Sequence, residues 1–162
     1  MAKKFSFDFQ LNSPLTPVIA LFASENFVQD AVAQSKAAAW DVTIKQPLPN
    51  LEIEISRTYR EDWPSMVKKF IGDDLVVNET RYWEPDGEHQ YFGTITARVV
   101  GQPITVDGKF TATEESGVTV VTVNGVVNCA IPFFGGQVES FAIDILQSGF
   151  EAEAELAQSR LS

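Results

Sequence analysis

The sequence is short of the residues from which metal centres, disulfide frameworks and hydrolytic triads are built. It has one cysteine, Cys129, and one histidine, His89, among 162 residues. These numbers exclude an intrachain disulfide and a Cys/His zinc cluster. A nucleophilic triad would have to recruit His89, which stands beside the turn expected at Asp86-Gly87. We therefore expect no metal site and no catalytic residue of these kinds, with Cys129 packed as a small buried hydrophobe.

Long apolar runs and a signal peptide are also missing. No stretch approaches the roughly 18 apolar residues that a membrane-spanning helix needs. The two lysines at positions 3 and 4 are followed by a segment that Ser6, Asp8 and Gln10 interrupt, unlike the continuous apolar core of a secretory signal. We expect a cytoplasmic protein without stable membrane insertion.

Basic residues are few, at 12 against 22 acidic ones, which gives a formal net charge of −10. Nucleic-acid binding depends on lysine and arginine neutralising phosphates, so we expect no nucleic-acid partner. Nucleotide motifs are absent too: there is no G-x-G-x-x-G pattern, and no Lys-Ser/Thr follows Gly135-Gly136. We expect no cofactor, and interpret the two glycines as a tight turn.

Hydrophobic periodicity predicts a strand, two short helices, a run of strands and one long helix. Phe5, Phe7, Phe9 and Leu11 alternate with polar residues, as in a half-buried strand. Two nearly continuous helices follow, with Ser13 and Ser24 as expected N-caps. Further strands are expected at about 40–45, 51–59, 75–83, 90–100, 104–112 and 118–131, with a short helix at 64–71 and with Glu114-Glu115 in a surface turn.

The last segment, 137 to about 159, contains no proline and one glycine, and it carries a broad apolar stripe. This pattern is typical of an amphipathic helix roughly 35 Å long. We expect its solvent face to carry Glu139, Asp144, Glu151, Glu153 and Glu155. A structural role is the preferred interpretation of Glu139, because general acid–base chemistry would require burial and a partner.

This order of elements predicts a single α+β domain spanning 1–162, in which a curved antiparallel sheet wraps around the long C-terminal helix. A helix on a curved sheet leaves an interior that either stays partly open, as a cavity for a small apolar ligand, or is filled by aromatic side chains. Phe7, Phe9, Trp83 and Phe110 are the residues that would fill it. Both outcomes remain open at this point.

Strict alternation turns several polar side chains of two strands inward. If Leu75 and Val77 face the interior, so do Glu79 and Arg81, and Arg57 and Tyr59 follow Ile53 and Ile55 in the same way. Buried charges are costly unless they are paired or hydrated. Arg57, Glu79 and Arg81 could therefore form a polar end to an apolar cavity, although a bulge, a strand end or a solvated rim is the preferred interpretation.

Three motifs carry a family resemblance over essentially the whole chain: Tyr82-Trp83-Glu84-Pro85-Asp86-Gly87, Gly101-Gln102-Pro103 with Gly108, and the segment from Ile131 to Glu139 that leads into the long helix. With the element order, they resemble the START-like (SRPBCC) superfamily, and within it an actinobacterial family, domain of unknown function 2505. The resemblance implies the helix-grip fold and a ligand cavity. It carries over no catalytic residue.

Three functions are compatible with the sequence. The first is binding or transport of a small hydrophobic or amphipathic, lipid-like ligand; the second is an enzyme of the cyclase, aromatase or hydratase kind that uses the polar end; the third is a protein-interaction module. Oligomeric state is left as monomer or homodimer. The residues expected to line the cavity are Phe7, Phe9, Ile53, Ile55, Arg57, Tyr59, Glu79, Arg81, Trp83, Ile95, Phe110, Val123, Phe141 and Ile145.

Overall fold

A computed structural model describes residues 2–60 and 63–162. The described residues form seven strands and four helices, in the order β1 (Ala2–Leu11), α1 (Leu15–Phe22), α2 (Glu25–Ala33), β2 (Ala39–Gln46), β3 (Leu51–Tyr59), α3 (Ser65–Ile71), β4 (Leu75–Pro85), β5 (Gln90–Val99), β6 (Ile104–Glu115), β7 (Val118–Cys129) and α4 (Gly135–Leu161). The predicted α+β order is confirmed, and the boundaries differ by a few residues at most strand ends.

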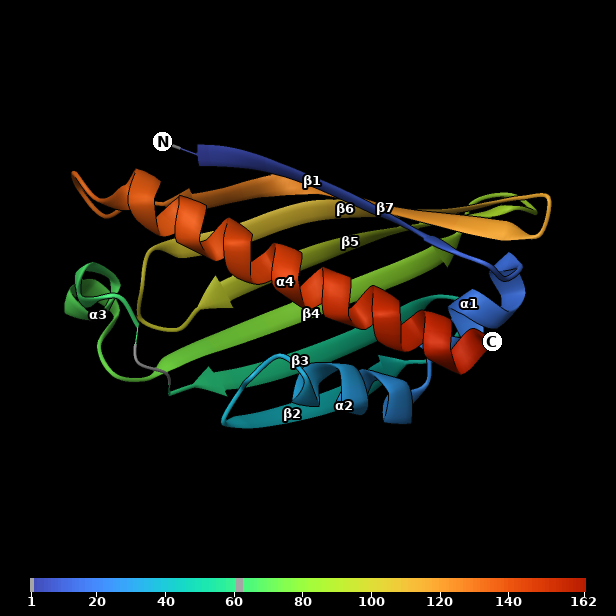
Figure 1. Cartoon of the computed structure of the whole chain (residues 1–162), viewed down its shortest axis with the longest axis horizontal. Coiled ribbons are helices and arrows are strands. Elements are labelled where there is room, and N and C mark those ends of the chain that lie inside the picture. Colours follow the sequence, from blue (N-terminus) through green and yellow to red (C-terminus); the bar gives the residue numbers. More distant parts are fainter. Residues whose placement is uncertain (1, 61–62) are drawn as a thin grey trace.

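All seven strands belong to one antiparallel sheet with the order β1-β7-β6-β5-β4-β3-β2. Strands β2 to β7 follow one another as a meander, and β1 returns to pair with β7 at the far edge. Helix α4 crosses one face of this sheet diagonally, and α1 and α2 lie on the same side (Figure 1). The backbone of α4 approaches β1 and β7 closely and also contacts α1 and α2.

The start of α1 differs from the prediction. Pro14, and not Ser13, occupies the N-cap position and offers no side-chain hydrogen bond. The amide of Leu15 instead donates to the Glu114 carboxylate at 2.7 Å, and the buried Ser13 carbonyl accepts from the Thr119 hydroxyl at 2.8 Å. Glu114 is therefore a distant cap for this helix, which no local pattern could indicate. Ser24 caps α2 as predicted, through its hydroxyl and the amide of Phe27.

Aromatic side chains fill one part of the space between the sheet and the helices. Trp83 and Phe110 stack with ring centroids 4.8 Å apart, and Phe22 stacks on Trp83 at 5.8 Å. Phe5 lies over Gly125, where an added Cβ would come within 2.7 Å of its ring and 2.3 Å of the Asp107 carbonyl oxygen. We call this region the aromatic cluster; its members are Phe5, Phe7, Phe22, Trp83, Phe110 and Phe150.

Candidate functional site

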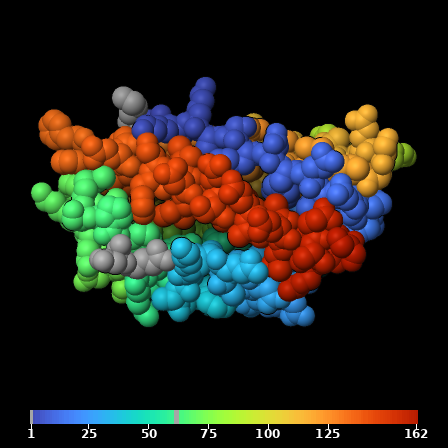
Figure 2. Space-filling view, in the orientation of Figure 1, coloured from blue at the N-terminus to red at the C-terminus, as the bar shows by residue number. Residues whose placement is uncertain are grey.

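A cavity of about 290 Å³ lies between α4, α2 and the sheet, and it is partly open to solvent. Helix α4 sits nearer to β1 and β7 than to β3 and β4, so its side chains do not reach the whole inner face of the sheet. Figure 2 shows that α4 and α2 lie next to each other over this face and cover most of it. The apolar part of the wall is made by Val28, Val32, Ile55, Ile145, Leu146 and Phe150.

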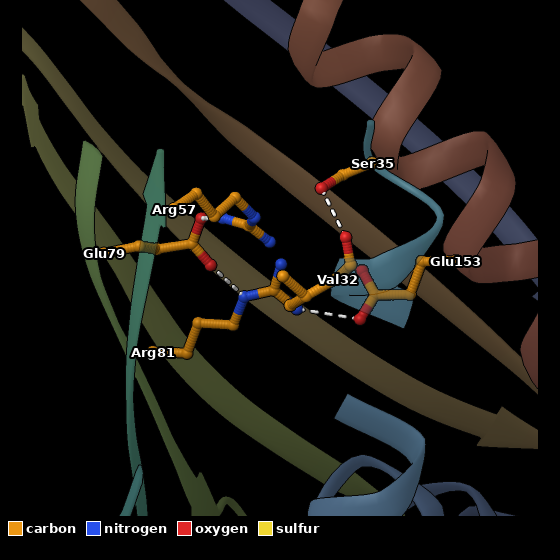
Figure 3. A network of polar contacts seen from close by, with 6 residues as sticks. All are labelled: Val32, Ser35, Arg57, Glu79, Arg81 and Glu153. Atoms are coloured by element: carbon orange, nitrogen blue, oxygen red, sulfur yellow. Dashed lines mark hydrogen bonds and ion pairs between the residues drawn. The ribbon is translucent and has the colours of Figure 1, made fainter. Parts of the chain in front are cut away.

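Four charged side chains form one wall of the cavity. Arg57 comes from β3, Glu79 and Arg81 from neighbouring β4, and Glu153 from α4 (Figure 3). Arg57 donates to Glu79 at 2.7 Å, Arg81 donates to the other Glu79 oxygen, and Arg81 also donates to Glu153 at 2.8 Å. We call these four residues the ion-pair cluster. They link the sheet to α4 across the interior.

Strand geometry explains why the cluster faces inward. Arg57 lies two residues after Ile55 on β3, and Glu79 pairs in register with Ile55, so these side chains share the buried face of the sheet. The side chain of Glu79 is only 5% exposed, and those of Arg57 and Arg81 are 12% and 13% exposed. The inward orientation predicted from alternation is thus observed, and the alternatives of a bulge, a strand end or a solvated rim do not apply.

Two members of the cluster, Glu79 and Arg81, are ionised at neutral pH. Burial alone would raise the pKa of Glu79, but the guanidinium groups of Arg57 and Arg81 outweigh it and lower this pKa to about 2. Burial would likewise lower the pKa of Arg81, yet Glu153 and Glu79 raise it. The buried Glu79 carboxylate and the largely buried side chains of Arg57, Arg81 and Glu153 are thus paired with one another in the wall of the cavity.

Arg81 marks the boundary between the cavity and the aromatic cluster. Its guanidinium carbon lies 5.7 Å from the ring centroid of Phe150 and 6.0 Å from that of Phe110. Beyond it, a space lined by Phe9, Trp83 and Phe110 measures only about 20 Å³, which leaves no room for a ligand. The interior is therefore hollow on one side of Arg81 and solid on the other.

The structure separates the predicted site residues into three groups. Ile55, Arg57, Tyr59, Glu79, Arg81 and Ile145 come together around the cavity. Phe9, Ile53, Trp83 and Phe110 surround the small space beyond Arg81 and fill it with their own side chains. The expectation that the remaining four line a cavity is not met in either space; they are Phe7, Ile95, Val123 and Phe141.

Local packing explains where those four residues lie. Ile95 and Val123 are fully buried in the middle of the sheet, where neighbouring side chains cover them. Phe7 stacks on Phe5 and contacts Phe150, within the aromatic cluster. Phe141 packs edge-on against Trp63, with ring centroids 5.6 Å apart. Alternation indicates which face a side chain occupies, but not whether another side chain already covers it.

Several cavity residues were not predicted. Val28 and Val32 belong to α2, and Ser35 and Lys36 belong to the segment that follows it. Glu153, expected on the solvent face of α4, is 13% exposed and binds Arg81. Gly149, the single glycine in the interior of the long helix, also lines the cavity, and a Cβ placed there would meet nothing within 4 Å. The lone glycine inside the expected helix was the one sequence signal of this position, because the open space beside it is visible only in the structure.

Glu139 is another exception to the expected solvent face. It is completely buried, and its Oε2 accepts a hydrogen bond of 2.8 Å from the Cys129 amide, which ties the start of α4 to the end of β7. Cys129 is buried as expected, and burial raises the pKa of its thiol. Neither residue lines the cavity described above.

Other site types find little support in the described part of the chain. His89 is exposed in the β4–β5 turn. Residues 2–60 and 63–162 contain no group of three or more His, Cys, Asp or Glu side chains placed to hold a metal ion. Within the same ranges, no helix combines the length and apolar character needed to cross a bilayer.

Comparison with known proteins identifies the family. The family model described as "Protein of unknown function (DUF2505)" matches residues 6–161. The chain belongs to this family. No curated protein sequence matches it.

Solved structures of distant relatives confirm the helix-grip fold of this DUF2505 member. A crystal structure of TTHA0849 from Thermus thermophilus is similar with a TM-score of 0.65 and 13% identity, covering 98% of this chain and 97% of that chain. A STAR-related lipid transfer protein from Xanthomonas axonopodis gives a TM-score of 0.64 at 12% identity, covering 96% and 85%. Norcoclaurine synthase from Thalictrum flavum gives 0.59 at 6% identity, covering 98% and 86%. These similarities establish a START-like fold.

Proposed function

We propose that this DUF2505 protein binds and carries a small hydrophobic or amphipathic ligand in the cavity between α2, α4 and the sheet. The observation that supports this most directly is the hollow itself: about 290 Å³ of space, walled largely by apolar side chains and partly open to solvent. Ligand sites are typically concave and mostly apolar, with a few placed polar groups. The similarity to a STAR-related lipid transfer protein agrees with this class of ligand.

The size of the cavity limits what it can enclose. A water molecule occupies about 30 Å³ of liquid, so this space accommodates roughly ten non-hydrogen atoms. A single ring with a short chain fits inside. A longer alkyl chain would extend through the opening, and a lipid with two long chains would remain largely outside.

Gly149, which lines the cavity, also supports the proposal. Glycine in a helix interior is less favourable than alanine by roughly 0.5–1 kcal/mol. Close packing does not require it here, because a Cβ would find no neighbour within 4 Å. A glycine at this position keeps the hollow clear of side-chain atoms.

An enzyme of the cyclase, aromatase or hydratase kind is the second candidate, favoured by the buried ion-pair cluster and by the fold shared with norcoclaurine synthase. Its chemistry would need a group that exchanges protons near neutral pH. Glu79, with a pKa of about 2 and both oxygens bonded to arginines, is a weak base. We therefore rank binding first, and retain a cytoplasmic location and a monomeric or homodimeric state as parts of the proposal.

Blocking the cavity tests this function. Native mass spectrometry of the purified protein should detect a co-purifying small molecule, or uptake of an added apolar fluorophore, in the wild type and in Gly149→Ala. Gly149→Leu, which places an isobutyl group in the hollow while improving helix propensity, should reduce uptake at least about tenfold. Equal uptake by Gly149→Leu, at a circular dichroism spectrum matching the wild type, would contradict the proposed site.

A further inference from the structure

The polar side chains of the cavity wall differ in how far their hydrogen-bonding capacity is used. Both oxygens of Glu79 accept from arginines, and Arg81 donates through Nε to Glu79 and through Nη1 to Glu153. Arg57 has five N–H donors but makes a hydrogen bond only through Nη1 to Glu79 within the described residues. In Figure 3 its guanidinium extends past Glu79 toward Val32 and Ser35, two other residues that line the cavity.

Two aromatic side chains beside Arg57 add further unused donors. Tyr59 lies two residues later on the same strand and the same face, and its hydroxyl makes no hydrogen bond in the part of the chain that the structure describes. Trp63 lines the same end of the cavity, and its buried Nε1–H has no partner among the described residues. Ser35 uses its hydroxyl hydrogen on the Val32 carbonyl. This end of the cavity therefore offers donors in excess of acceptors.

The charges of the wall are already compensated. Arg57 and Arg81 face Glu79 and Glu153, so the ion-pair cluster has no net charge. Lys36 and Asp144, both exposed where they line the cavity, also carry opposite charges. An anionic head group beside Arg57 and Tyr59 would lie near the carboxylates of Glu79 and Glu153, and Arg57 and Arg81 are already paired with those carboxylates, so its charge would be poorly compensated there. A neutral oxygen can accept from Arg57 without that penalty.

Resting on the proposed binding function, we infer that the ligand is an uncharged molecule whose carbonyl or hydroxyl oxygen accepts hydrogen bonds from Arg57 and Tyr59. Its apolar body lies along Ile55, Val32 and Ile145. Because residues two apart on one strand point the same way, Arg57 and Tyr59 reach the ligand from the same side. A carboxylic acid ionised at neutral pH is excluded from this site.

Three probes of nearly the same shape test the inference by isothermal titration or by displacement of a bound fluorophore at pH 7. They are 4-phenylbutan-2-one, 3-phenylpropanoate and 3-methylbutylbenzene, which share a phenyl ring and chain and differ in bearing a neutral acceptor, a charge or neither. The ketone should bind at least about tenfold more tightly than the carboxylate. Comparable or tighter binding of the carboxylate would overturn the inference.

Variants of the two donors show whether the ketone oxygen is recognised where we infer. Tyr59→Phe removes one hydroxyl and leaves the ring in place, and Arg57→Lys keeps the charge opposite Glu79 while removing the planar fork. Each should weaken ketone binding about 3–10-fold and change hydrocarbon binding less than about twofold. An equal effect on both probes, or no effect on the ketone, would contradict the role of that donor.

Failure of the inference can be distinguished from failure of the proposed function. If the hydrocarbon or an apolar fluorophore binds and Gly149→Leu blocks it, the cavity is a binding site even when the donor variants have no selective effect. If no probe or fluorophore binds, and Gly149→Leu behaves like the wild type, both proposals fail together.

Discussion

The two ends of the interior share strands β3 and β4 and helix α4, yet one is solid and the other hollow. At the aromatic cluster, Trp83 and Phe110 stack face to face and leave about 20 Å³. A few residues along the same strand, Glu79 and Arg81 stand where further large apolar side chains could have closed the space. The difference shows how this chain keeps its cavity open: charged side chains link α4 to the sheet without filling the volume between them.

The largest expected change in the free energy of unfolding comes from replacing isoleucine by alanine, at one position away from the cavity and at one that lines it. Ile95 and Ile55 are both completely buried on neighbouring parts of the sheet, but only Ile55 lines the cavity. Ile95→Ala should lower the free energy of unfolding by about 4 kcal/mol, and Ile55→Ala by about 2 kcal/mol, because Ile55 already lacks partner atoms on one side. Urea denaturation of both variants measures this; equal losses would mean that the hollow is closed in solution.

Buried charge makes the hollow end sensitive to acid. The pKa of Glu79 is about 2 in the folded protein against an ordinary value of 4.5, so between these values the unfolded chain binds a proton that the folded protein does not. The ionised Glu79 carboxylate therefore contributes on the order of 3 kcal/mol to the free energy of unfolding above about pH 4.5. This contribution is lost as the pH falls toward 2.

The matched variant for this acid effect is Glu79→Gln. It should be less stable than the wild type at pH 7, because two buried arginines lose their shared carboxylate. Its free energy of unfolding should also fall less between pH 4.5 and pH 2 than that of the wild type. Parallel pH profiles of the two proteins would contradict the low pKa assigned to Glu79.

Two carboxylates of α4 provide a comparison of intermediate size. Glu153 is only 13% exposed and is bonded to Arg81 at 2.8 Å, whereas Glu151 is exposed and, among the described residues, bonded only to Gln147 one turn earlier. Glu153→Gln should cost about 2 kcal/mol of stability, and Glu151→Gln no more than about 0.5 kcal/mol. Thermal unfolding of both variants tests the bracing role of Glu153, which is disproved if the two shift the melting temperature equally.

Sequence periodicity located the inner face of the sheet well, including the unusual inward positions of Arg57, Glu79 and Arg81. It succeeded because strand alternation follows from backbone geometry alone. It failed on α4, where Glu139 and Glu153 were assigned to solvent, since a helix that packs on a sheet and on α1 and α2 buries more than one stripe. The size of the cavity could not be predicted from the sequence either, because it depends on the distance between α4 and strands β3 and β4.

The smallest expected change in stability is that of Gly149→Ala at the hollow end, and Gly125→Ala at the solid end serves as its comparison. At Gly125 an added Cβ would lie 2.3 Å from the Asp107 carbonyl oxygen and 2.7 Å from the Phe5 ring, so Gly125→Ala should be destabilising because the backbone and ring must shift. At Gly149 the same atom meets nothing within 4 Å, and alanine is the better helix former. Gly149→Ala should therefore raise the free energy of unfolding by roughly 0.5–1 kcal/mol, which for a chain of this size corresponds to a few degrees in melting temperature.

Differential scanning calorimetry resolves such a shift. A lower melting temperature for Gly149→Ala would show that α4 lies closer to its neighbours than the cavity requires, and the contrast between a solid and a hollow end would then be lost.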